Sequence, residues 1–519
     1  MRVPRPARIL LLAALLGCET RTQYVAGLPW GEPAGPTRGG RGLGGAGGDA
    51  GRIWLSTYGD IRVKASPSVD PAPAPRRSTL DLGTNPRTIS VDTALSGDHP
   101  LGDDGSTEAT GLWVKSGAML TVAMGSLYVG GPILIEGTVT SSYDAGASRR
   151  VSIDLGALAI VVGSTGLVDV SAGPEGGPGS VTLRTGDGDI VVQGSISARG
   201  RDGASPTAGG TVELRSTGEV VVDGILDARG GSTDAGGGGS GGYLVVGNAA
   251  SGEFPSRIHV TGEIHLRGGD GASGGGAGGW LDARALDATA LTGIVDAGGG
   301  QSTGPGGGGG MIWVSAPRSW LTGRIDAPGG AGVGSGRGGE GGQLLVLGGG
   351  FLSGKIDLSG GDGITGAPGG LLIVDSHDPL APAAIVLAGF DPLASDGGDG
   401  TAGGGAGGTF DVTGNVVDLG VSLSANAGSA LELREGGGGG TVRVQGSALT
   451  CRSIIANGGD AAARAGGHGG AVTLTSPAGS TIDGTITVRG GSGQPQGHFG
   501  SVVVDDVTRT VHDDGVYAP

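Results

Sequence analysis

The sequence predicts an all-β protein, a parallel β-helix of about 12–14 coils with long glycine-rich loops at one corner. Two observations predict this fold. Short apolar runs alternate with period two, which is the spacing of a β-strand that buries one face. The order of these runs repeats about every 31 residues, so that each unit can stack on the next and bury its aliphatic side chains.

One unit shows the pattern clearly. Three strand-like runs, 212–214, 220–222 and 225–228, are followed by a glycine-rich loop at 230–242, and the cycle starts again at Tyr243. Three strands of three to five residues cannot bury a face alone. Stacked at about 4.8 Å they can, because neighbouring coils then share one continuous core.

The turn before the third run gives the period of the repeat. It recurs at intervals of 30–38 residues, at Gly194, Gly224, Gly262, Gly293, Gly323, Gly354, Gly389, Val421, Arg452 and Gly484. The third run then reads apolar–x–apolar in nearly every unit. The unit after Gly389 is the poorest, since Asp391-Pro392-Leu393 replaces that pattern.

The first eighteen residues have the features of an export signal. Arg2, Arg5 and Arg8 precede a short apolar run at 9–16, which is too short to span a bilayer. The run ends in Leu-Leu-Gly-Cys18, which resembles the bacterial lipobox. The resemblance implies cleavage before Cys18, acylation of this residue and a membrane partner reached through the lipid anchor. An ordinary secretory signal with an accidental cysteine is the alternative.

The rest of the chain divides by composition. We expect the following segments: 19–37 as a tether, 38–65 as a glycine loop and outlying coil, 66–110 as a Pro-rich insertion or linker, 111–505 as the β-helix, and 506–519 as a C-terminal tail. Residues 111–172 are expected to form shorter coils without long glycine loops.

Composition and charge narrow the class further. Among 519 residues there are 121 Gly and 26 Pro, without the three-residue glycine period of collagen. Such a content is typical of disordered chains, but the regular apolar alternation favours a folded core. The net charge of −16 disfavours nucleic-acid partners. Cys451 has no disulfide partner if Cys18 carries lipid.

Taken together, the repeat and the export signal resemble the glycine-rich right-handed parallel β-helix surface lipoproteins common in myxobacteria and related bacteria. The resemblance covers about 39–505. It implies the right-handed coil, export, and a lipid-anchored place at the outer membrane or cell surface. It implies no particular activity.

The long glycine loops have two interpretations. They all fall between a third run and the next first run, so that loops of adjacent coils stack side by side. They form either an ordered sheath of closely packed backbone or a set of mobile solvated loops, since glycine permits both.

Acidic residues recur at two positions. Asp296, Asp326 and Asp357 would face outward on successive third strands, and a Ca²⁺ ladder would relieve their repulsion. A solvated acidic stripe is the alternative, and no other cofactor is expected. The second recurrence opens the glycine loops and is interpreted as turn residues, at Asp202, Asp270, Asp362, Asp399 and Asp460.

A third column is apolar. Val245, Trp313, Leu345 and Ile373 are expected on the outer side of the first strands. Such a stripe marks a partner surface if it is exposed. Alternatively, the glycine loops cover it.

Catalysis is poorly supported. Asp98-His99 with Asp103-Asp104, and Asp375-Ser-His377-Asp378, are the best polar clusters, and turn chemistry explains both. The metalloprotease motif His-Glu-x-x-His and the Walker nucleotide-binding loop are missing from the sequence. We therefore expect a non-enzymatic envelope lipoprotein with a structural or adhesive role and a polysaccharide or other cell-surface partner. The alternative is a secreted carbohydrate-active β-helix, a polysaccharide lyase or glycosidase.

Overall fold

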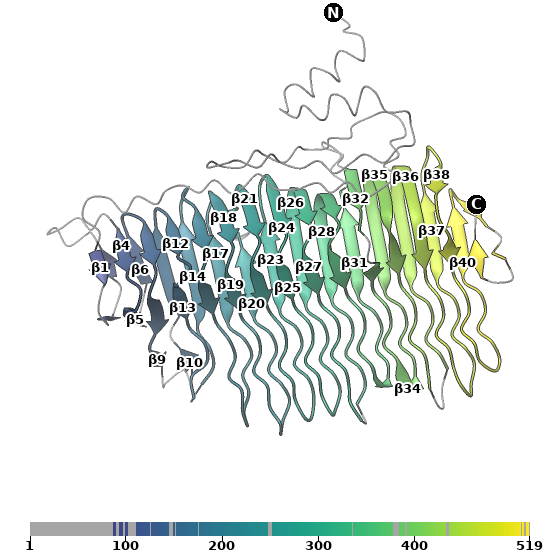
Figure 1. Cartoon of the computed structure of the whole chain (residues 1–519), viewed down its shortest axis with the longest axis horizontal. Helices are drawn as coiled ribbons and strands as arrows, with labels where there is room; N and C mark the ends of the chain where they lie inside the picture. The colour runs from purple at the N-terminus through teal and green to yellow at the C-terminus, as the bar shows by residue number, and fades with distance from the viewer. Residues whose placement is uncertain are drawn as a thin grey trace, which may run out of the picture.

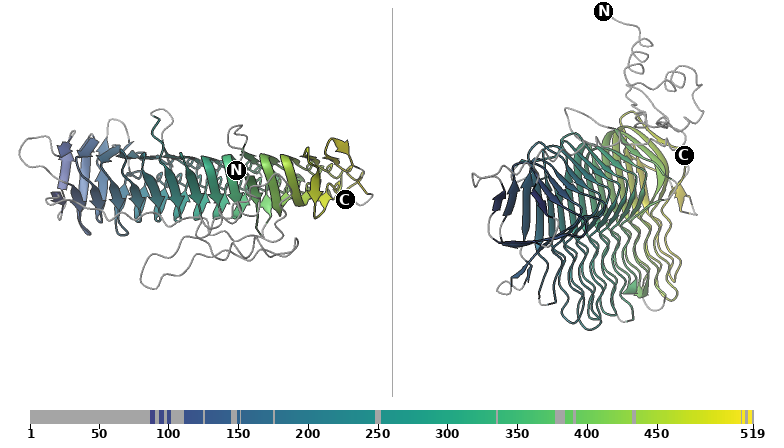
Figure 2. Two further views of the ribbon diagram at one scale, coloured as in Figure 1. Left: turned by 90° about the horizontal axis from the view of Figure 1, so that it is seen from above. Right: turned by 60° about the vertical axis from the view of Figure 1, so that its left-hand side comes forward.

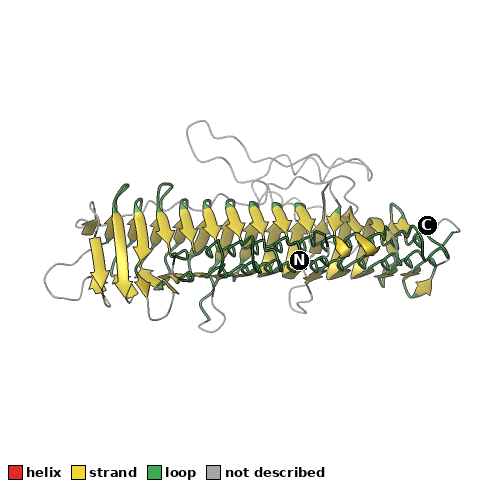
Figure 3. Ribbon diagram, turned by 90° about the horizontal axis from the view of Figure 1, so that it is seen from below, coloured by secondary structure: helices red, strands yellow, loops and turns green. Residues whose placement is uncertain are grey.

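The chain forms an elongated parallel β-solenoid in a computed structural model (Figure 1). The structure describes residues 111–519 with gaps at 125, 145–148, 151, 175, 248–251, 335, 377–383, 390–391, 432–434, 510, 513–514 and 518–519, and before them the strands at 87–89, 93–96 and 99–101. Every regular element in this described part is a strand, as the alternation predicted (Figure 3).

Each coil contributes one strand to each of three faces. The rungs of the first face pair in parallel in this order: β3 (His99–Leu101), β6 (Ser126–Val129), β11 (Ile153–Ala157), β14 (Ser180–Thr185), β17 (Thr211–Arg215), β20 (Tyr243–Val246), β23 (Trp280–Arg284), β26 (Met311–Leu321), β28 (Gln343–Leu352), β31 (Leu371–Asp375), β35 (Thr409–Ser424), β36 (Thr441–Ile455), β37 (Ala471–Thr475) and β40 (Ser501–Val504).

The second face contains β1 (Arg87–Ile89), β4 (Leu112–Val114), β7 (Ile133–Ile135), β12 (Ile160–Val162), β15 (Ile190–Val192), β18 (Glu219–Val222), β21 (Arg257–Val260), β24 (Ala288–Leu291), the second parts of β26 and β28, β32 (Ala384–Leu387), the middle of β35 and of β36, and β38 (Ser480–Ile482). The number of rungs falls within the 12–14 coils expected.

The third face completes the coil. It contains β2 (Thr93–Ser96), β5 (Met119–Met124), β8 (Thr138–Ser141), β13 (Leu167–Asp169), β16 (Ser195–Ser197), β19 (Ile225–Asp227), β22 (Glu263–His265), β25 (Ile294–Asp296), β27 (Arg324–Asp326), β29 (Lys355–Asp357), β33 (Leu393–Ala394), the ends of β35 and β36, and β39 (Ile486–Thr487).

Two short strand pairs and two single strands lie outside the parallel faces. β9 (Tyr143–Asp144) and β10 (Arg149–Arg150) form a hairpin, and β30 (Gly363–Thr365) pairs with β34 (Gly400–Gly403) between two glycine loops. The two single strands are β41 (Val507–Thr508), which pairs antiparallel with β40, and β42 (Val516–Tyr517), which pairs antiparallel with β39.

Aliphatic columns fill the solenoid. Ile264, Val295, Ile325 and Ile356 stack on successive rungs of the third face, and each is at most 1% exposed. Cys451 lies in a corresponding column of the second face between Leu419 and Ile482. Cys451 is fully buried in the core, and this burial raises the pKa of its thiol to about 12.

The glycine loops are ordered and stack in register as a slab beside the strands (Figures 1 and 2). Each loop runs out and back, and backbone hydrogen bonds join the two arms within a loop and between loops. One continuous series reads Gly239 N to Gly231 O, Gly269 N to Gly239 O, Gly276 N to Gly269 O, Gly300 N to Gly276 O, and Gly307 N to Gly300 O, at 2.8–2.9 Å. Of the two interpretations, the structure shows the ordered sheath.

Close approach explains the glycines of this slab. A Cβ on Gly276 would collide with the carbonyl oxygen of Gly239, and a Cβ on Gly307 with that of Gly276. Neither residue has a positive φ. The slab therefore selects glycine because its arms pack backbone against backbone, which no side chain permits.

Short strands are present at both ends of the described solenoid. The strands at 87–101 pair with β4, β5 and β6, so parallel pairing already occurs within the segment 66–110 that the sequence predicted to be an insertion or linker. These strands have only three or four residues each. At the C-terminal end, parts of the expected tail form β41 and β42. The signal peptide with Cys18, the tether and the outlying coil lie outside the described residues.

Candidate binding surface

A group of aromatic and charged side chains gathers on the outer side of the first face. The pairing of β20, β23 and β26 places Trp280 between Tyr243 and Met311, and Asp282 between Val245 and Trp313. Arg284 follows on the same side of β23, because alternate residues of a strand point the same way. We call this set the aromatic patch: Tyr243, Val245, Trp280, Asp282, Arg284, Met311 and Trp313.

Two rings of the patch are open to solvent. Tyr243 is 53% exposed and Trp280 is 37% exposed. Their ring centroids lie 6.1 Å apart at an interplanar angle of 47°. Because both residues are fixed on paired strands, the two rings form one corrugated surface on a rigid base.

The third ring of the patch, the indole of Trp313, contacts the ion pair of Arg284 and Asp282. The guanidinium of Arg284 lies 4.6 Å from the ring centroid of Trp313, within the range of a cation–π contact. Asp282 accepts two hydrogen bonds from Arg284, from Nε to Oδ1 at 2.7 Å and from Nη2 to Oδ2 at 2.8 Å. This pair orients the guanidinium over the indole ring.

Several polar atoms of the patch have no hydrogen-bond partner among the residues that the structure describes. The indole nitrogen of Trp313 is buried and has no hydrogen-bond partner within the described part of the chain. Among the described residues, neither the Tyr243 hydroxyl nor the Trp280 indole N–H has a partner. A buried N–H without a partner is costly, and exposed donors beside apolar rings are suited to a polar ligand.

The structure also decides whether this face is covered. The glycine loops extend away from the strands and do not fold over the first face (Figure 1). The predicted stripe of Val245, Trp313, Leu345 and Ile373 does lie in one column, interrupted by Asp282, with each member half-buried. Sequence reasoning missed Tyr243 and Trp280, although strand alternation places Tyr243 beside Val245.

The expected acidic column is present on the third face. Asp296, Asp326 and Asp357 occupy directly paired positions on β25, β27 and β29. Asp296 accepts a hydrogen bond from Gly298 N, and Asp357 accepts one from Ser359 N, both at 3.1 Å. These are local contacts, two residues along the chain, that turn each strand into its glycine loop.

Asp326 differs from its two neighbours. It is 7% exposed, forms an ion pair with Arg324 through Oδ2, and has a buried Oδ1 for which the described residues supply no partner. Burial raises the pKa of Asp326 above its ordinary value, Arg324 opposes this, and Asp357 adds to the rise. Across the part of the chain that the structure describes, no group of three or more His, Cys, Asp or Glu is arranged to hold a metal ion.

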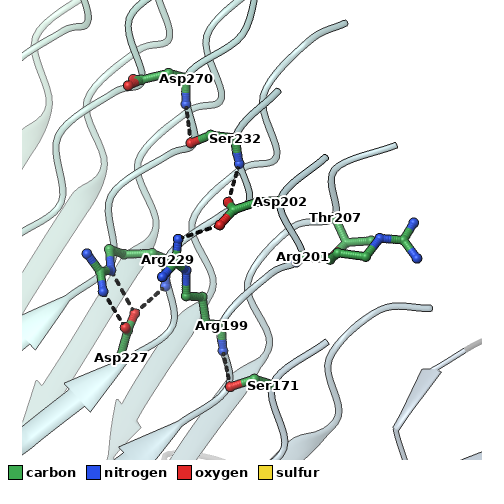
Figure 4. Close-up of polar contacts among 9 residues, drawn as sticks. All are labelled: Ser171, Arg199, Arg201, Asp202, Thr207, Asp227, Arg229, Ser232 and Asp270. Atoms are coloured by element: carbon green, nitrogen blue, oxygen red, sulfur yellow. Dashed lines mark hydrogen bonds and ion pairs between the residues drawn. The ribbon is translucent and has the colours of Figure 1, made fainter. Parts of the chain in front are cut away.

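The acidic residues that open the glycine loops were expected to be turn residues. In the structure they form hydrogen bonds to the loop of the next coil (Figure 4). Asp202 accepts a hydrogen bond from Ser232 N, and the Ser232 hydroxyl accepts one from Asp270 N. The same contact recurs from Ser429 N to Asp399 and from Ser492 N to Asp460. The side chain at this position thus joins each loop to the next.

Most residues of the predicted polar clusters lie outside the described residues. His99 lies in β3, while Asp98, Asp103 and Asp104 lie outside the described residues. Asp375 ends β31, and His377 and Asp378 are likewise outside them. Asp418, which belongs to neither cluster, has a strongly raised pKa. Burial, and then the charge of Asp483, raises the pKa of this carboxyl to about 6.

Two further findings bear on function. The described residues contain no helix that is long and apolar enough to cross a membrane. No protein-family model, curated protein or solved structure matches the chain.

Proposed function

We propose that this chain is a non-enzymatic, lipid-anchored envelope protein of bacteria, exported to the outer membrane or cell surface, where it acts as a rigid structural or adhesive rod. The observation that carries the proposal is the uninterrupted stacking of coils from β4 to β40, whose glycine loops are themselves hydrogen-bonded from coil to coil. Such a body holds an exposed binding surface at a fixed distance from an anchor.

The sequence supports the anchor. The basic residues, the short apolar run and Cys18 have the order of a lipoprotein signal, and the net charge of −16 suits a solvated exterior surface. Acyl chains on Cys18 would attach the rod by its N-terminal end.

Labelling in a Gram-negative host tests the anchor. Cells that express the full chain are fed a clickable fatty acid, fractionated, and treated with protease from outside. We expect the label in wild type and in Cys451→Ala, and none in Cys18→Ser, which is released from the membrane fraction. Label retained by Cys18→Ser, or protein confined to the cytoplasm, contradicts the proposal.

Activity assays test the non-enzymatic part. The purified full chain is incubated with neutral and acidic polysaccharides, and new reducing ends and unsaturated sugars are measured. We expect neither product. Their formation would establish the carbohydrate-active alternative instead.

A further inference from the structure

We propose that the aromatic patch binds a neutral polysaccharide, whose sugar rings stack on Tyr243 and Trp280 while its hydroxyl groups bond to the polar edges around them. This inference rests on the adhesive role proposed above and names its partner. It starts from the two exposed rings, which lie on neighbouring rungs with centroids 6.1 Å apart.

The shape of the patch suits a sugar polymer. Pyranose rings present C–H groups on their faces, and these pack on the electron-rich faces of tyrosine and tryptophan. The patch follows the stacking direction from β20 through β23 to β26, so that ring contacts continue along the rod. A chain molecule lying across the rungs can use several such contacts at once.

The polar groups suit the hydroxyls of a sugar. The Tyr243 hydroxyl and Trp280 N–H have no partner in the described part of the chain, and both can donate to a sugar oxygen. Asp282 retains lone pairs beyond those used by Arg284, and the guanidinium retains N–H groups. The patch therefore offers donors and acceptors beside the rings, as a sugar hydroxyl requires.

The charge of the protein favours a neutral ligand. With a net charge of −16, the chain repels anionic polysaccharides and also a second copy of itself. Within the patch, Arg284 is already neutralised by Asp282. A uronic-acid polymer would find no free cation among these seven side chains.

The exposed part of the patch differs from an apolar protein–protein interface, because its exposed side chains are amphipathic and not aliphatic. Val245, Met311 and the neighbouring Leu345 are half-buried between rungs, whereas the well-exposed members are Tyr243 and Trp280. Both have a polar edge. Rigid amphipathic rings of this kind give contact area at little cost in side-chain entropy.

Binding to insoluble polysaccharides tests the proposal. The full chain in mild detergent is mixed with cellulose, chitin or starch granules as neutral probes and with pectate coupled to a neutral resin as an anionic probe, in calcium-free buffer at low and high salt. Tyr243→Ala, Trp280→Ala and the double variant are compared with Tyr128→Ala. Tyr128 is an exposed aromatic residue on the same face, outside the patch.

We expect wild type and Tyr128→Ala to bind at least one neutral polysaccharide with little dependence on salt. The double variant should bind at least about tenfold more weakly, since exposed Tyr and Trp anchors dominate such contacts. Circular dichroism and melting temperature confirm that each variant is folded.

Three outcomes overturn the proposal: no binding to any neutral probe, equal binding by the double variant, or salt-sensitive binding to pectate alone. A patch-dependent self-association of the rod, seen by light scattering in place of glycan binding, also overturns it. None of these results changes the Cys18 labelling experiment, so failure here is distinguishable from failure of the anchored-rod proposal.

Discussion

Asp202 and Ser232 occupy the same position in successive glycine loops, and the carboxylate of Asp202 accepts a hydrogen bond from the backbone N–H of Ser232 at 2.7 Å. The contact joins two coils, although both residues lie in segments that resemble isolated turns in the sequence. Asp399 repeats it with Ser429 N, and the Asp399 N–H itself donates to Asp362, each at 2.7 Å. The loops are therefore connected at their polar edge as well as through glycine backbone.

Removing one of these acceptors should weaken the slab locally. We expect Asp399→Ala to lower the free energy of unfolding by about 0.5–1.5 kcal/mol, because Ser429 N loses a charged acceptor at an exposed position. Asp399→Asn keeps an acceptor oxygen and should lose less. Urea unfolding measures the change, and hydrogen exchange at Ser429 locates it. Equal stability of Asp399→Ala and wild type, with slow exchange retained at Ser429, would contradict this role.

Glycine packing gives a sharper comparison within a single loop. Gly276→Ala would place a Cβ against the carbonyl oxygen of Gly239, whereas a Cβ on Gly274 meets nothing closer than 3.9 Å. We expect Gly276→Ala to destabilise the fold by roughly 1–3 kcal/mol through forced backbone shifts, and Gly274→Ala to be neutral or slightly stabilising. Thermal unfolding of both variants measures this. The packing argument fails if the two substitutions have the same effect.

The contrast between core and loops shows what the sequence could predict. Period-two alternation at positions such as Ile264, Val295 and Ile325 directly reports an inward face, so the three faces and their repeat followed from the residues. Gly276 and Gly274 look identical in sequence. Only the path of the neighbouring loop shows that the first is packed against backbone and the second is open.

The binding surface was predictable only in part. Alternation places Tyr243, Val245 and Trp313 on the outer side of the first face, but whether loops cover that side depends on the direction in which the loops leave the corner. The Arg284 contact with Trp313 also depends on register between coils, because these residues are 29 positions apart and belong to different strands. The third-face strand of the unit after Gly389 was also difficult to place from the sequence, because Asp391-Pro392-Leu393 breaks the apolar pattern. In the structure this strand, β33, begins at Leu393.

Asp418 should make stability depend on pH. Its pKa is raised from 3.8 to about 6 by burial and by Asp483, so the folded state binds this proton more tightly than the unfolded state. The ionised carboxyl therefore destabilises the fold at pH 7, and the penalty is relieved as the pH falls from about 7 towards 4. We expect Asp418→Asn to be more stable than wild type at pH 7.5 by about 1–3 kcal/mol.

The advantage of Asp418→Asn should shrink as the pH approaches 4. Urea unfolding at several pH values measures it, with Asp234→Asn, a substitution at an exposed loop carboxyl, as the control. A constant difference between Asp418→Asn and wild type across this range would show that the carboxyl is not protonated more readily in the fold.

Calcium provides a test of the acidic column. The hypothesis of a cation ladder along Asp296, Asp326 and Asp357 competes with the contacts that these residues already make, since Asp296 and Asp357 accept local N–H groups and Asp326 pairs with Arg324. We expect the same melting temperature in EDTA and in millimolar Ca²⁺. A rise of several degrees with Ca²⁺ that is lost in Asp326→Asn would establish the ladder.

The C-terminal strands should keep the rod from associating end to end. β41 pairs antiparallel with β40, and β42 pairs with β39, so that two edges of the last coil are already occupied. Asp505 and Asp506, with φ of 51° and 60°, form the tight turn into β41. Truncation after Asp505 leaves both edges free, and unpaired edges of this kind pair with other chains. We expect concentration-dependent oligomers of the truncated chain in sedimentation experiments. Asp506→Gly, which favours the same turn, should behave as wild type does, and a truncated chain that sediments like the full chain at all concentrations would rule out the capping role.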